Sequence, residues 1–297
     1  MEDFRLKVFC SVARNLSFTK ASQELAISQP AISKHIQELE QTYGVKLFDR
    51  SAHRISLTNA GAVLFTHAEE ILDHYRALNF DMHMLSQGHE GVLRLGADAI
   101  IAQYFIPGHL ADFSTKFQDI KLSFIEGNTQ AIEDAVEEQH IDLGLVDGHL
   151  RKPHLRYTPF MQDNLVLVAS TSGRWAHLDS VTLRQMTEMP LVLHDDNGSN
   201  LEVIEHALSL HEMTLTHLNI AMRLGSAEGV KRYAIQSDSV ALISIHAALP
   251  EMKMGQLKTI DVEDVTFGRY FYFVRNLGQT NPLVRDFIDY IQQNINR

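Results

Sequence analysis

Beyond residue 91, short apolar runs alternate with helical patterns, and this alternation constrains the fold more than any other feature of the sequence. VLRLGA, KLSFIEG and IDLGLVDG predict strands, and the segments between them predict helices. A second set begins at NLVLVAS and continues through PLVLH, LNIAMRLG and VALIS, followed by GRYFYFVR and a helical pattern over 281–295. Such alternation predicts parallel α/β layers. Two similar sets predict two lobes and a cleft between them at the carboxyl ends of the strands, where open α/β sheets bind ligands.

The segment from residue 17 to residue 43 predicts two helices joined by about three residues. Ser17 can cap the helix FTKASQEL, and Ser28 can cap the next helix. Pro30 is tolerated there because the N–H groups of a first helical turn have no intrahelical partner. The second helix carries one apolar stripe, formed by Ile32, Ile36 and Leu39.

The opposite face of this second helix carries short polar and basic side chains, namely Pro30, Ser33, Lys34, Gln37 and Gln41. Two interpretations fit this face taken alone. It is either an ordinary solvated surface or a surface that contacts base edges in the major groove of DNA. A tight pair of helices whose second member has an uncommitted polar face predicts a helix-turn-helix.

The stretch after Tyr43 predicts a small wing. Gly44 can end the preceding helix. Leu47, Ile55 and Leu57 then suggest two short strands with a polar turn between them. Three basic or titratable residues lie on or beside this turn, where DNA phosphates would be: Arg50, His53 and Arg54. His53 either joins the contact when protonated or is a neutral residue of the wing.

A long helix is predicted from about residue 59, after a cap at Thr58 or Asn59, to about residue 86. Its apolar residues recur at alternating spacings of four and three, the heptad signature of a coiled-coil seam: Leu64, Ala68, Ile71, Tyr75, Leu78, Met82 and Leu85. The stripe either docks on the rest of the same chain or pairs with a second chain. We expect pairing, because a dimer would place two recognition helices on one DNA molecule.

The distribution of charge separates the first sixty residues from the rest. The whole chain has a net charge of −11. Residues 1–60 contain eight Lys/Arg and six Asp/Glu, a net +2, so the remaining residues carry −13. An acidic bulk joined to a mildly basic head is expected when only the head meets phosphate.

Several other classes of protein are not supported by the sequence. No apolar run approaches a membrane span, no signal peptide is evident, and the single cysteine, Cys10, is expected to be buried and inert, so we expect a cytoplasmic protein without disulfides. The sixteen histidines show no metal-ligand spacing. We find no G-x-S-x-G elbow and no nucleotide-binding glycine run. We therefore expect no metal, no cofactor and no enzyme activity.

Together these segments resemble the LysR-type transcriptional regulators. The likeness covers the whole chain and is most specific in LSFTKASQELAISQPAISKHIQELEQTYGVKLFDRSAHRISLTNAG. It implies a winged helix-turn-helix at 1–58, a dimerisation helix at 59–88 and an effector-binding domain at 89–297 that is built like a periplasmic binding protein. Lobe I would comprise 89–164 and 268–297, and lobe II 165–267. The implied partners are double-stranded DNA, a small-molecule effector and further copies of the chain, as a dimer or tetramer.

The resemblance also implies roles for particular residues. In the head, the implied DNA contacts are Thr19, Ser28, Gln29, Pro30, Ser33, Lys34, Gln37, Arg50, His53 and Arg54. In the effector domain, the implied ligand contacts are Asp98, Ala99, Ile100, Thr129, Asp147, Asn197, Ser199, Asn200 and Ser226. The alternative functions are a solute-binding protein without a DNA-binding role, which would have no use for residues 1–60, and a periplasmic-binding-like enzyme, which would need a catalytic constellation.

The predicted effector site departs from the family pattern. Relatives that bind anions usually have Ser or Thr after the first strand, where this chain has Asp98, Ala99 and Ile100. The arginine of the family's Gly-Ser-Gly-Thr-Arg run is absent from 197–201, and Asp195 and Asp196 precede that run. In one interpretation Asp98 acts only as a helix cap, and in a second the site is degenerate or the ligand binds elsewhere. The third possibility is that the site rejects small dianions and takes a neutral, zwitterionic or cationic effector.

Overall fold

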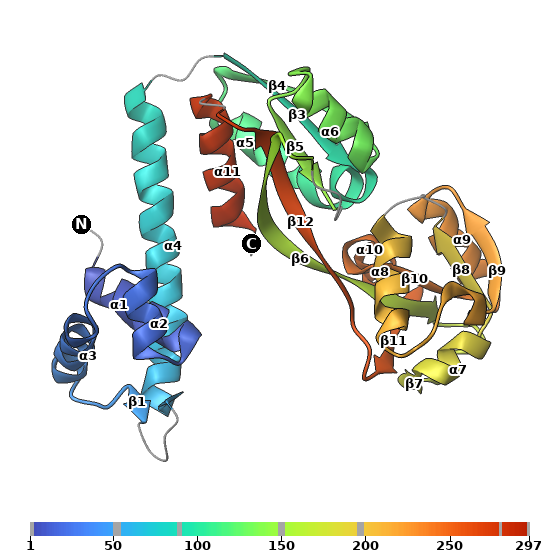
Figure 1. The fold of residues 1–297 in the computed structure, drawn as a ribbon, viewed down its shortest axis with the longest axis horizontal. Coiled ribbons are helices and arrows are strands. Elements are labelled where there is room, and N and C mark those ends of the chain that lie inside the picture. Colours follow the sequence, from blue (N-terminus) through green and yellow to red (C-terminus); the bar gives the residue numbers. More distant parts are fainter. Residues whose placement is uncertain are drawn as a thin grey trace. The chain divides into compact units, whose positions relative to one another are not determined.

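The computed structural model describes residues 3–49, 55–87, 91–147, 152–194, 199–278 and 281–295. The chain divides into two compact units, which we call the head unit (residues 1–88) and the two-lobed unit (residues 89–295). No helix in the described ranges combines the length and apolar character that crossing a membrane requires. Figure 1 labels the helices and strands of both units.

The head unit is a winged helix-turn-helix followed by a long helix, as predicted. Its elements are α1 (Phe4–Asn15), α2 (Phe18–Glu24), α3 (Gln29–Tyr43), β1 (Phe48–Asp49), β2 (Ser56–Leu57) and α4 (Asn59–Gln87). Ser17 and Ser28 cap α2 and α3, and Gly44 ends α3 with a φ of 70°. β1 and β2 pair antiparallel to form the predicted wing. Of the two predicted caps of α4, the structure shows Thr58, whose Oγ1 accepts a hydrogen bond of 3.0 Å from Gly61 N.

The core of the head unit is formed where α1, α2 and α3 meet the first half of α4. Ile32 and Ile36 are fully buried and Leu39 is 2 % exposed, so the predicted stripe of α3 faces this core. Cys10 is buried, as expected. The buried carboxylate of Glu40 accepts a hydrogen bond from Leu47 N and pairs with Lys46, which ties the end of α3 to the start of the wing.

The apolar stripe of α4 divides into two parts. Ala68 is fully buried in the head core, and Leu72, which the predicted stripe did not include, is 2 % exposed. Ile71, which lies between these two buried residues, is 41 % exposed, and farther along the helix Leu78 and Met82 are 53 % and 58 % exposed. The side chain of Leu85 lies outside the described part of the helix. Ala68 and Leu72 therefore dock on the head core, whereas Ile71, Leu78 and Met82 leave apolar surface that the rest of the head unit does not cover.

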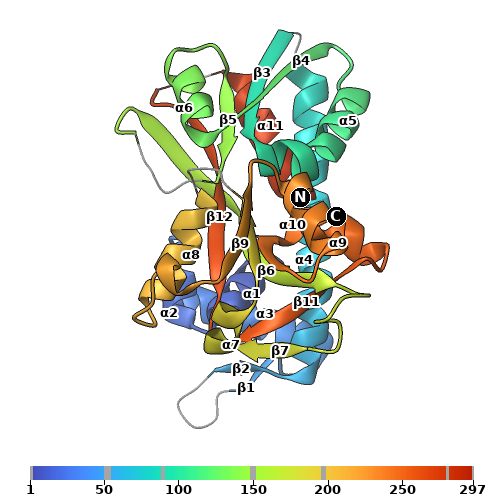
Figure 2. The ribbon, with the colours of Figure 1, turned by 90° about the vertical axis from the view of Figure 1, so that its right-hand side faces the viewer.

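The two-lobed unit is built on one continuous sheet. Its strands are β3 (Gly91–Asp98), β4 (Ile120–Gly127), β5 (Leu143–Val146), β6 (Leu155–Ser170), β7 (Ser180–Thr182), β8 (Leu191–His194), β9 (Ile220–Leu224), β10 (Val240–Ser244), β11 (Leu257–Glu263) and β12 (Phe267–Asn276). The main order is β4-β3-β5-β12-β6-β10-β8-β9, with β11 beside β6 and β7 beside β11. Figure 2 shows the strands gathered in two groups, one for each lobe.

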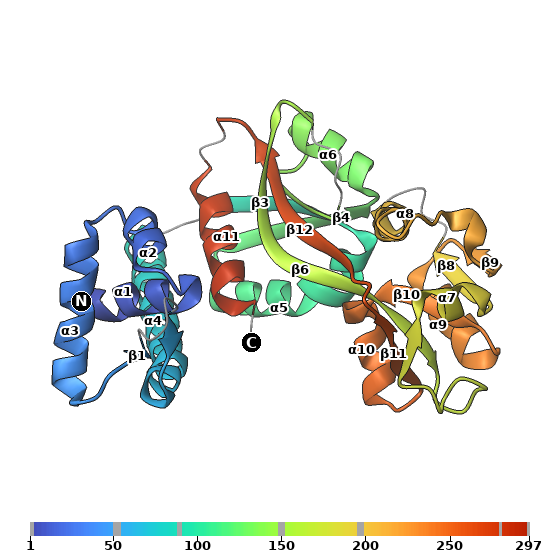
Figure 3. The same cartoon turned by 60° about the horizontal axis from the view of Figure 1, so that its bottom comes forward.

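Strands β6 and β12 join the two lobes. They pair antiparallel from Leu155↔Asn276 to Leu165↔Phe267, and Figure 3 shows them side by side between the two groups of strands. Within each lobe, β3 pairs parallel with β4 and β5, and β8 pairs parallel with β9 and β10. The prediction of parallel layers holds for these strands. It fails for β6, which runs antiparallel to β10 because the chain passes between lobes along β6 and returns along β12.

Helices complete both lobes. They are η1 (Ile101–Phe105), α5 (Ile106–Lys116), α6 (Thr129–Glu137), α7 (Leu183–Glu188), α8 (Ser199–Ser209), η2 (Leu215–His217), α9 (Ala227–Gln236), α10 (Ile245–Lys253) and α11 (Pro282–Asn294). The sequence patterns missed β7, α7, α10 and β11. β7 and α7 are short, and α10 is interrupted by Pro250, so these three elements show too little periodicity to be recognised.

Two glycines allow α6 to pack closely on the first lobe's sheet. A Cβ atom on Gly144 would lie 2.8 Å from Ile132 Cγ2, and one on Gly96 would lie 3.1 Å from Ile132 Cδ1. Ile132 and Val136 of α6 are buried in the core that this contact forms. The close approach holds the N-terminus of α6, with Thr129, beside the end of β5, with Asp147.

Candidate functional site

The outward face of α3 is exposed where the sequence predicted DNA contacts. Ser28, Gln29 and Pro30 are exposed at the start of the helix, as are Lys34 and Gln37 one and two turns later. Ser33 on the same helix is partly buried, and Thr19 is exposed on α2. Arg50, His53 and Arg54 lie outside the described residues.

The exposed polar groups of α3 differ in how far their own chain occupies them. Ser28 Oγ accepts a hydrogen bond of 3.4 Å from Ala31 N as the helix cap. Lys34 Nζ lies 3.9 Å from Glu38 Oε1, at the limit of an ion pair, and its side chain is 75 % exposed. A weak surface pair of this kind contributes little to stability, so Lys34 can exchange it for a phosphate.

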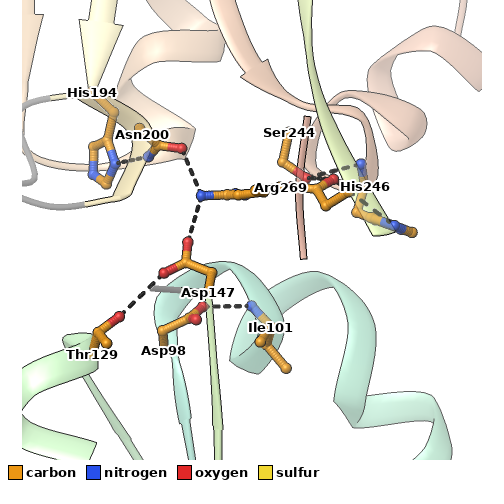
Figure 4. A network of polar contacts seen from close by, with 10 residues as sticks. Asp98, Ile101, Thr129, Asp147, His194, Asn200, Ser244, His246 and Arg269 are labelled. Atoms are coloured by element: carbon orange, nitrogen blue, oxygen red, sulfur yellow. Dashed lines mark hydrogen bonds and ion pairs between the residues drawn. The ribbon is translucent and has the colours of Figure 1, made fainter. Parts of the chain in front are cut away.

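A buried arginine forms the centre of a polar network between the two lobes (Figure 4). Arg269 comes from β12, and its side chain is fully buried. Its Nη1 donates to Asp147 Oδ2 at 2.5 Å and to Asn200 Oδ1 at 3.0 Å. Its Nε donates to Asp163 Oδ2 at 2.8 Å. Since Asp147 follows β5 in the first lobe and Asn200 lies on α8 in the second, Arg269 bridges the lobes.

The first lobe contributes three of the predicted effector residues to this network. Thr129 Oγ1, at the start of α6, donates to Asp147 Oδ1 at 3.1 Å. Asp98, at the end of β3, is 5 % exposed, and its Oδ1 accepts a hydrogen bond of 3.0 Å from Ile101 N. Burial, and then the nearby charge of Asp147, raise the pKa of Asp98 well above its ordinary value.

The helix-cap interpretation of Asp98 therefore accounts for only one of its two carboxylate oxygen atoms, Oδ1. Oδ2 is buried and has no hydrogen-bond partner in the described part of the chain. A carboxyl group in such surroundings favours its neutral form, because the charged form would lack compensation. The structure thus makes Asp98 a candidate donor or a candidate carboxylate for a ligand, in addition to its capping role.

The second lobe completes the network through two short segments. Asn200 Nδ2 and His194 Nδ1 lie 3.2 Å apart at the end of β8 and the start of α8. Ser244 Oγ donates to Asp163 Oδ1 at 2.8 Å, and His246 Nε2 lies 4.0 Å from the same oxygen atom. We call Asp98, Thr129, Asp147, Asp163, Asn200 and Arg269 the junction network.

The remaining predicted effector residues are distributed differently. Ile100 is buried and Ala99 is partly buried beside Asp98. Asn197 lies outside the described residues, and Ser199 is described only by its place at the start of α8. Ser226 caps α9, where its Oγ accepts a hydrogen bond from Gly229 N, so it lies outside the junction network as far as the described residues define it.

Sequence analysis missed Arg269, the central residue of the network. The family pattern places an arginine at 197–201, where this chain has none, and the GRYFYFVR pattern predicts only a late strand. A signal was present, because Arg269 is a charge on the inward-facing side of that strand, where Phe267, Phe271 and Phe273 are buried. A charge among buried aromatic residues requires a partner of opposite charge.

A second polar contact joins the lobes away from Arg269. Tyr104 Oη, on η1, donates to Glu228 Oε1, on α9, at 2.5 Å. The same oxygen atom of Glu228 lies 2.6 Å from Lys231 Nζ, and that ammonium group lies 4.7 Å from the centre of the Tyr104 ring. Glu251 also pairs with Lys231, at 2.9 Å. The lobes are thus held in this structure by two separate clusters of charged and polar groups.

A winged helix-turn-helix, a long helix and a two-lobed α/β domain with a polar network between its lobes define a ligand-responsive DNA-binding transcriptional regulator. The family comparisons agree. Residues 4–62 match the bacterial regulatory helix-turn-helix protein model of the lysR family, and residues 86–296 match the LysR substrate binding domain. The chain belongs to the LysR family of transcriptional regulators.

Individual relatives show the same architecture. A probable RuBisCO transcriptional regulator of Cyanidioschyzon merolae is 30 % identical over an alignment of 279 residues that covers 92 % of this chain and 91 % of the relative. CrgA, a LysR-type transcriptional regulator of Neisseria meningitidis, has a TM-score of 0.68 and 20 % identity, covering 99 % of this chain and 98 % of its own. Full-length CbnR complexed with target DNA has a TM-score of 0.58 and 18 % identity, covering 99 % of both chains. These findings favour a regulator over a solute-binding protein without a DNA-binding role.

Proposed function

We propose that the first turns of α3 enter the major groove of a specific DNA site and that the wing flanks the groove. The observation that carries this proposal is the division of α3 into a fully buried apolar stripe and an exposed polar face. Gln29 and Ser33 would discriminate between bases, and Lys34 would contact phosphate. Thr19 and Ser28 would add phosphate hydrogen bonds, and the sequence places Arg50, His53 and Arg54 at the wing. The CbnR complex supports DNA binding by a protein of this fold.

Binding of the full-length protein to its own upstream region tests this assignment. Fluorescence anisotropy would be measured between about 50 mM and about 200 mM salt, with the variants Lys34→Glu and Lys253→Glu. Both side chains are exposed, and Lys253 lies on α10 in the two-lobed unit, so the second variant controls for the change in net charge. Loss of one phosphate contact in each head should weaken binding and reduce the salt slope by about one per head. Equal binding by the two variants would contradict the proposed role of Lys34.

The second proposal is that α4 pairs two chains and that further contacts produce a tetramer. The exposed apolar side chains of Leu78 and Met82 support it, because adjacent exposed apolar residues at heptad spacing favour helix pairing. In sedimentation equilibrium, Leu78→Asp/Met82→Asp should dissociate at concentrations where the wild type is oligomeric. Val63→Asp is the control, since Val63 is 61 % exposed on the same helix but outside the stripe. Unchanged assembly of the double variant would refute pairing through this stripe.

The third proposal concerns control by a small molecule. A ligand that binds differently to two arrangements of the lobes would shift their populations, and in an oligomer this would change the spacing of the paired heads and the bending of DNA. Because the protein acts on DNA, we place it in the cytoplasm, and we assign it no enzyme activity. Native mass spectrometry of the freshly purified protein would reveal a bound small molecule.

A further inference from the structure

Four residues form a cluster across the boundary between the lobes, away from Arg269, and we call them the Tyr104 cluster. Tyr104 lies on η1 in the first lobe, whereas Glu228 and Lys231 lie on α9 and Glu251 on α10 in the second. Tyr104 Oη donates to Glu228 Oε1 at 2.5 Å, and Lys231 Nζ lies 4.7 Å from the centre of the Tyr104 ring. The cluster therefore joins the lobes through one neutral side chain.

The charges of the Tyr104 cluster are balanced within the second lobe. The side chain of Lys231 is 2 % exposed, and its Nζ lies 2.9 Å from both carboxylate oxygen atoms of Glu251 and 2.6 Å from Glu228 Oε1. A buried ammonium group without such partners would be costly. Because both carboxylates belong to the second lobe, separation of the lobes breaks no ion pair of the cluster and leaves no buried charge without a partner.

Tyr104 is the donor in the contact between the lobes. Burial, and then the hydrogen bond and the charge of Glu228, raise the pKa of the Tyr104 hydroxyl. Burial would raise the pKa of Glu228 as well, but hydrogen bonds from Lys231 and Tyr104 outweigh it and lower that pKa. Near neutral pH a protonated hydroxyl therefore meets an ionised carboxylate, which makes a charge-assisted hydrogen bond.

The turn that carries Tyr104 also contacts the junction network. The helix after β3 is continuous over residues 99–116, and η1 is a single π-helical turn within it. Such turns are rare and are frequently found at functional sites. Ile101 N, in the same turn, donates to Asp98 Oδ1 (Figure 4). One irregular turn thus connects a residue of the junction network with the hydroxyl that contacts the second lobe.

We propose that Tyr104 is a reversible latch between the lobes, whose hydroxyl favours the arrangement of this structure and detaches from Glu228 when the lobes separate. The regulatory consequence rests on the control by a small molecule proposed above. A ligand that displaces Asp98 would move the π-helical turn and Tyr104 with it, so it would change the populations of the closed and open arrangements.

The size of the effect follows from the exposure of the partners. A hydrogen bond to a charged group typically changes an equilibrium by roughly tenfold to a hundredfold. The side chain of Glu228 is 48 % exposed, so water competes for its carboxylate and the lower end of this range applies. Loss of the Tyr104 hydroxyl should therefore change the ratio of open to closed protein by about tenfold.

Distances between two spin labels, measured by double electron–electron resonance on the full-length protein, test the latch. The labels are attached to Ala111→Cys on α5 and Gln236→Cys on α9, which replace exposed residues of the two lobes, in a Cys10→Ser background. Labelled chains are diluted in a large excess of unlabelled protein, so that distances between subunits do not contribute. The measurement uses neither DNA nor a ligand.

Tyr104→Phe keeps the ring over Lys231 but removes the hydroxyl, and it should raise the ratio of long to short distances about tenfold. Glu228→Ala should shift the ratio in the same direction, since Lys231 keeps its pair with Glu251. In the Glu228→Ala background, Tyr104→Phe should then have no further effect, because the bond is already lost. Tyr270→Phe is the matched control, since Tyr270 is 49 % exposed in the same unit.

Three results would overturn the proposal: an unchanged ratio in Tyr104→Phe, an equal shift in Tyr270→Phe, or a full additional shift when Tyr104→Phe is added to Glu228→Ala. Binding of the same preparations to DNA separates this inference from the proposed function. Failure of the wild type to bind DNA would contradict the proposed function, whereas normal DNA binding with unchanged distances would contradict only the latch.

Discussion

Replacement of Arg269 by methionine should destabilise the two-lobed unit severely. Arg269→Met removes the guanidinium but keeps an unbranched side chain of similar length in a site that has no access to solvent. Asp147 and Asp163 would remain buried without the ion pairs that they make at 2.5 and 2.8 Å. Because both carboxylates are buried, they would carry their desolvation penalty without that compensation.

The size of this loss of stability follows from two opposing contributions, the attraction within the ion pairs and the cost of desolvating the charges. At an effective dielectric constant of about 20, each close ion pair is worth roughly 6 kcal/mol before desolvation. Desolvation costs several kcal/mol for each ion, so the intact network contributes little net stability. Removal of the arginine alone deletes the attraction and leaves the desolvation of the carboxylates, which corresponds to a loss of about 3–5 kcal/mol in the free energy of unfolding.

Urea unfolding followed by tryptophan fluorescence measures this loss of stability in the two-lobed unit itself. The chain has one tryptophan, and Trp175 packs against the core of the second lobe. With a slope of about 2 kcal/mol/M, the midpoint should fall by about 1.5–2.5 M urea. Arg156→Met, which changes an exposed arginine on β6, should alter stability by less than about 0.5 kcal/mol.

A triple variant distinguishes the electrostatic explanation from simple loss of packing. Arg269→Met/Asp147→Asn/Asp163→Asn removes all three charges, so it should recover a large part of the stability that the single variant loses. The reasoning would be refuted by a loss below about 1 kcal/mol in the single variant, or by a triple variant no more stable than the single one.

Three further outcomes are expected. Gly61→Ala should destabilise the head by about 1–3 kcal/mol in thermal unfolding, because its Cβ would lie 2.1 Å from the backbone oxygen of Leu47; an unchanged midpoint would contradict that contact. Ser28→Ala should cost about 0.5–2 kcal/mol through loss of the cap of α3, whereas Ser28→Asn should restore it, and circular dichroism during heating compares the two. Asp98→Asn should become more stable relative to the wild type as pH rises above the ordinary Asp value of 3.8, since the raised folded-state pKa makes the native state bind the proton that the unfolded state loses. Melting curves between about pH 5 and about pH 8 check the sign, and a difference that shrinks with rising pH would contradict it.

Local patterns in the sequence were sufficient for the head unit and for the order of most strands. Ser17, Ser28 and Gly44 mark helix ends through hydrogen bonds or backbone angles that involve only neighbouring residues. The apolar periodicity of α3 likewise determines which face is buried, because a helix of known period must turn its stripe toward a core. The polar face was therefore predictable by elimination, although its role in binding DNA remains a proposal.

Patterns confined to neighbouring residues could not show which parts of the chain meet. Thr129 and Asp147 were named as site residues and they bond to each other, but the contact of Asp147 with Arg269 depends on a strand more than a hundred residues farther along the chain. The same limit applies to α4, where the heptad spacing did not show that Ala68 is buried in the head while Leu78 is exposed.

The amino-acid sequence by itself determined the class of each unit, since periodicity and capping act over a few residues. Only the tertiary structure decided which charges meet in the junction network, because the effect of a buried charge depends on the partners that folding brings into contact with it. β12 returns beside β6 and places the guanidinium of Arg269 between Asp147, Asp163 and Asn200. That long-range pairing places Arg269 at the centre of an acidic network, although the segment 197–201 contains no arginine.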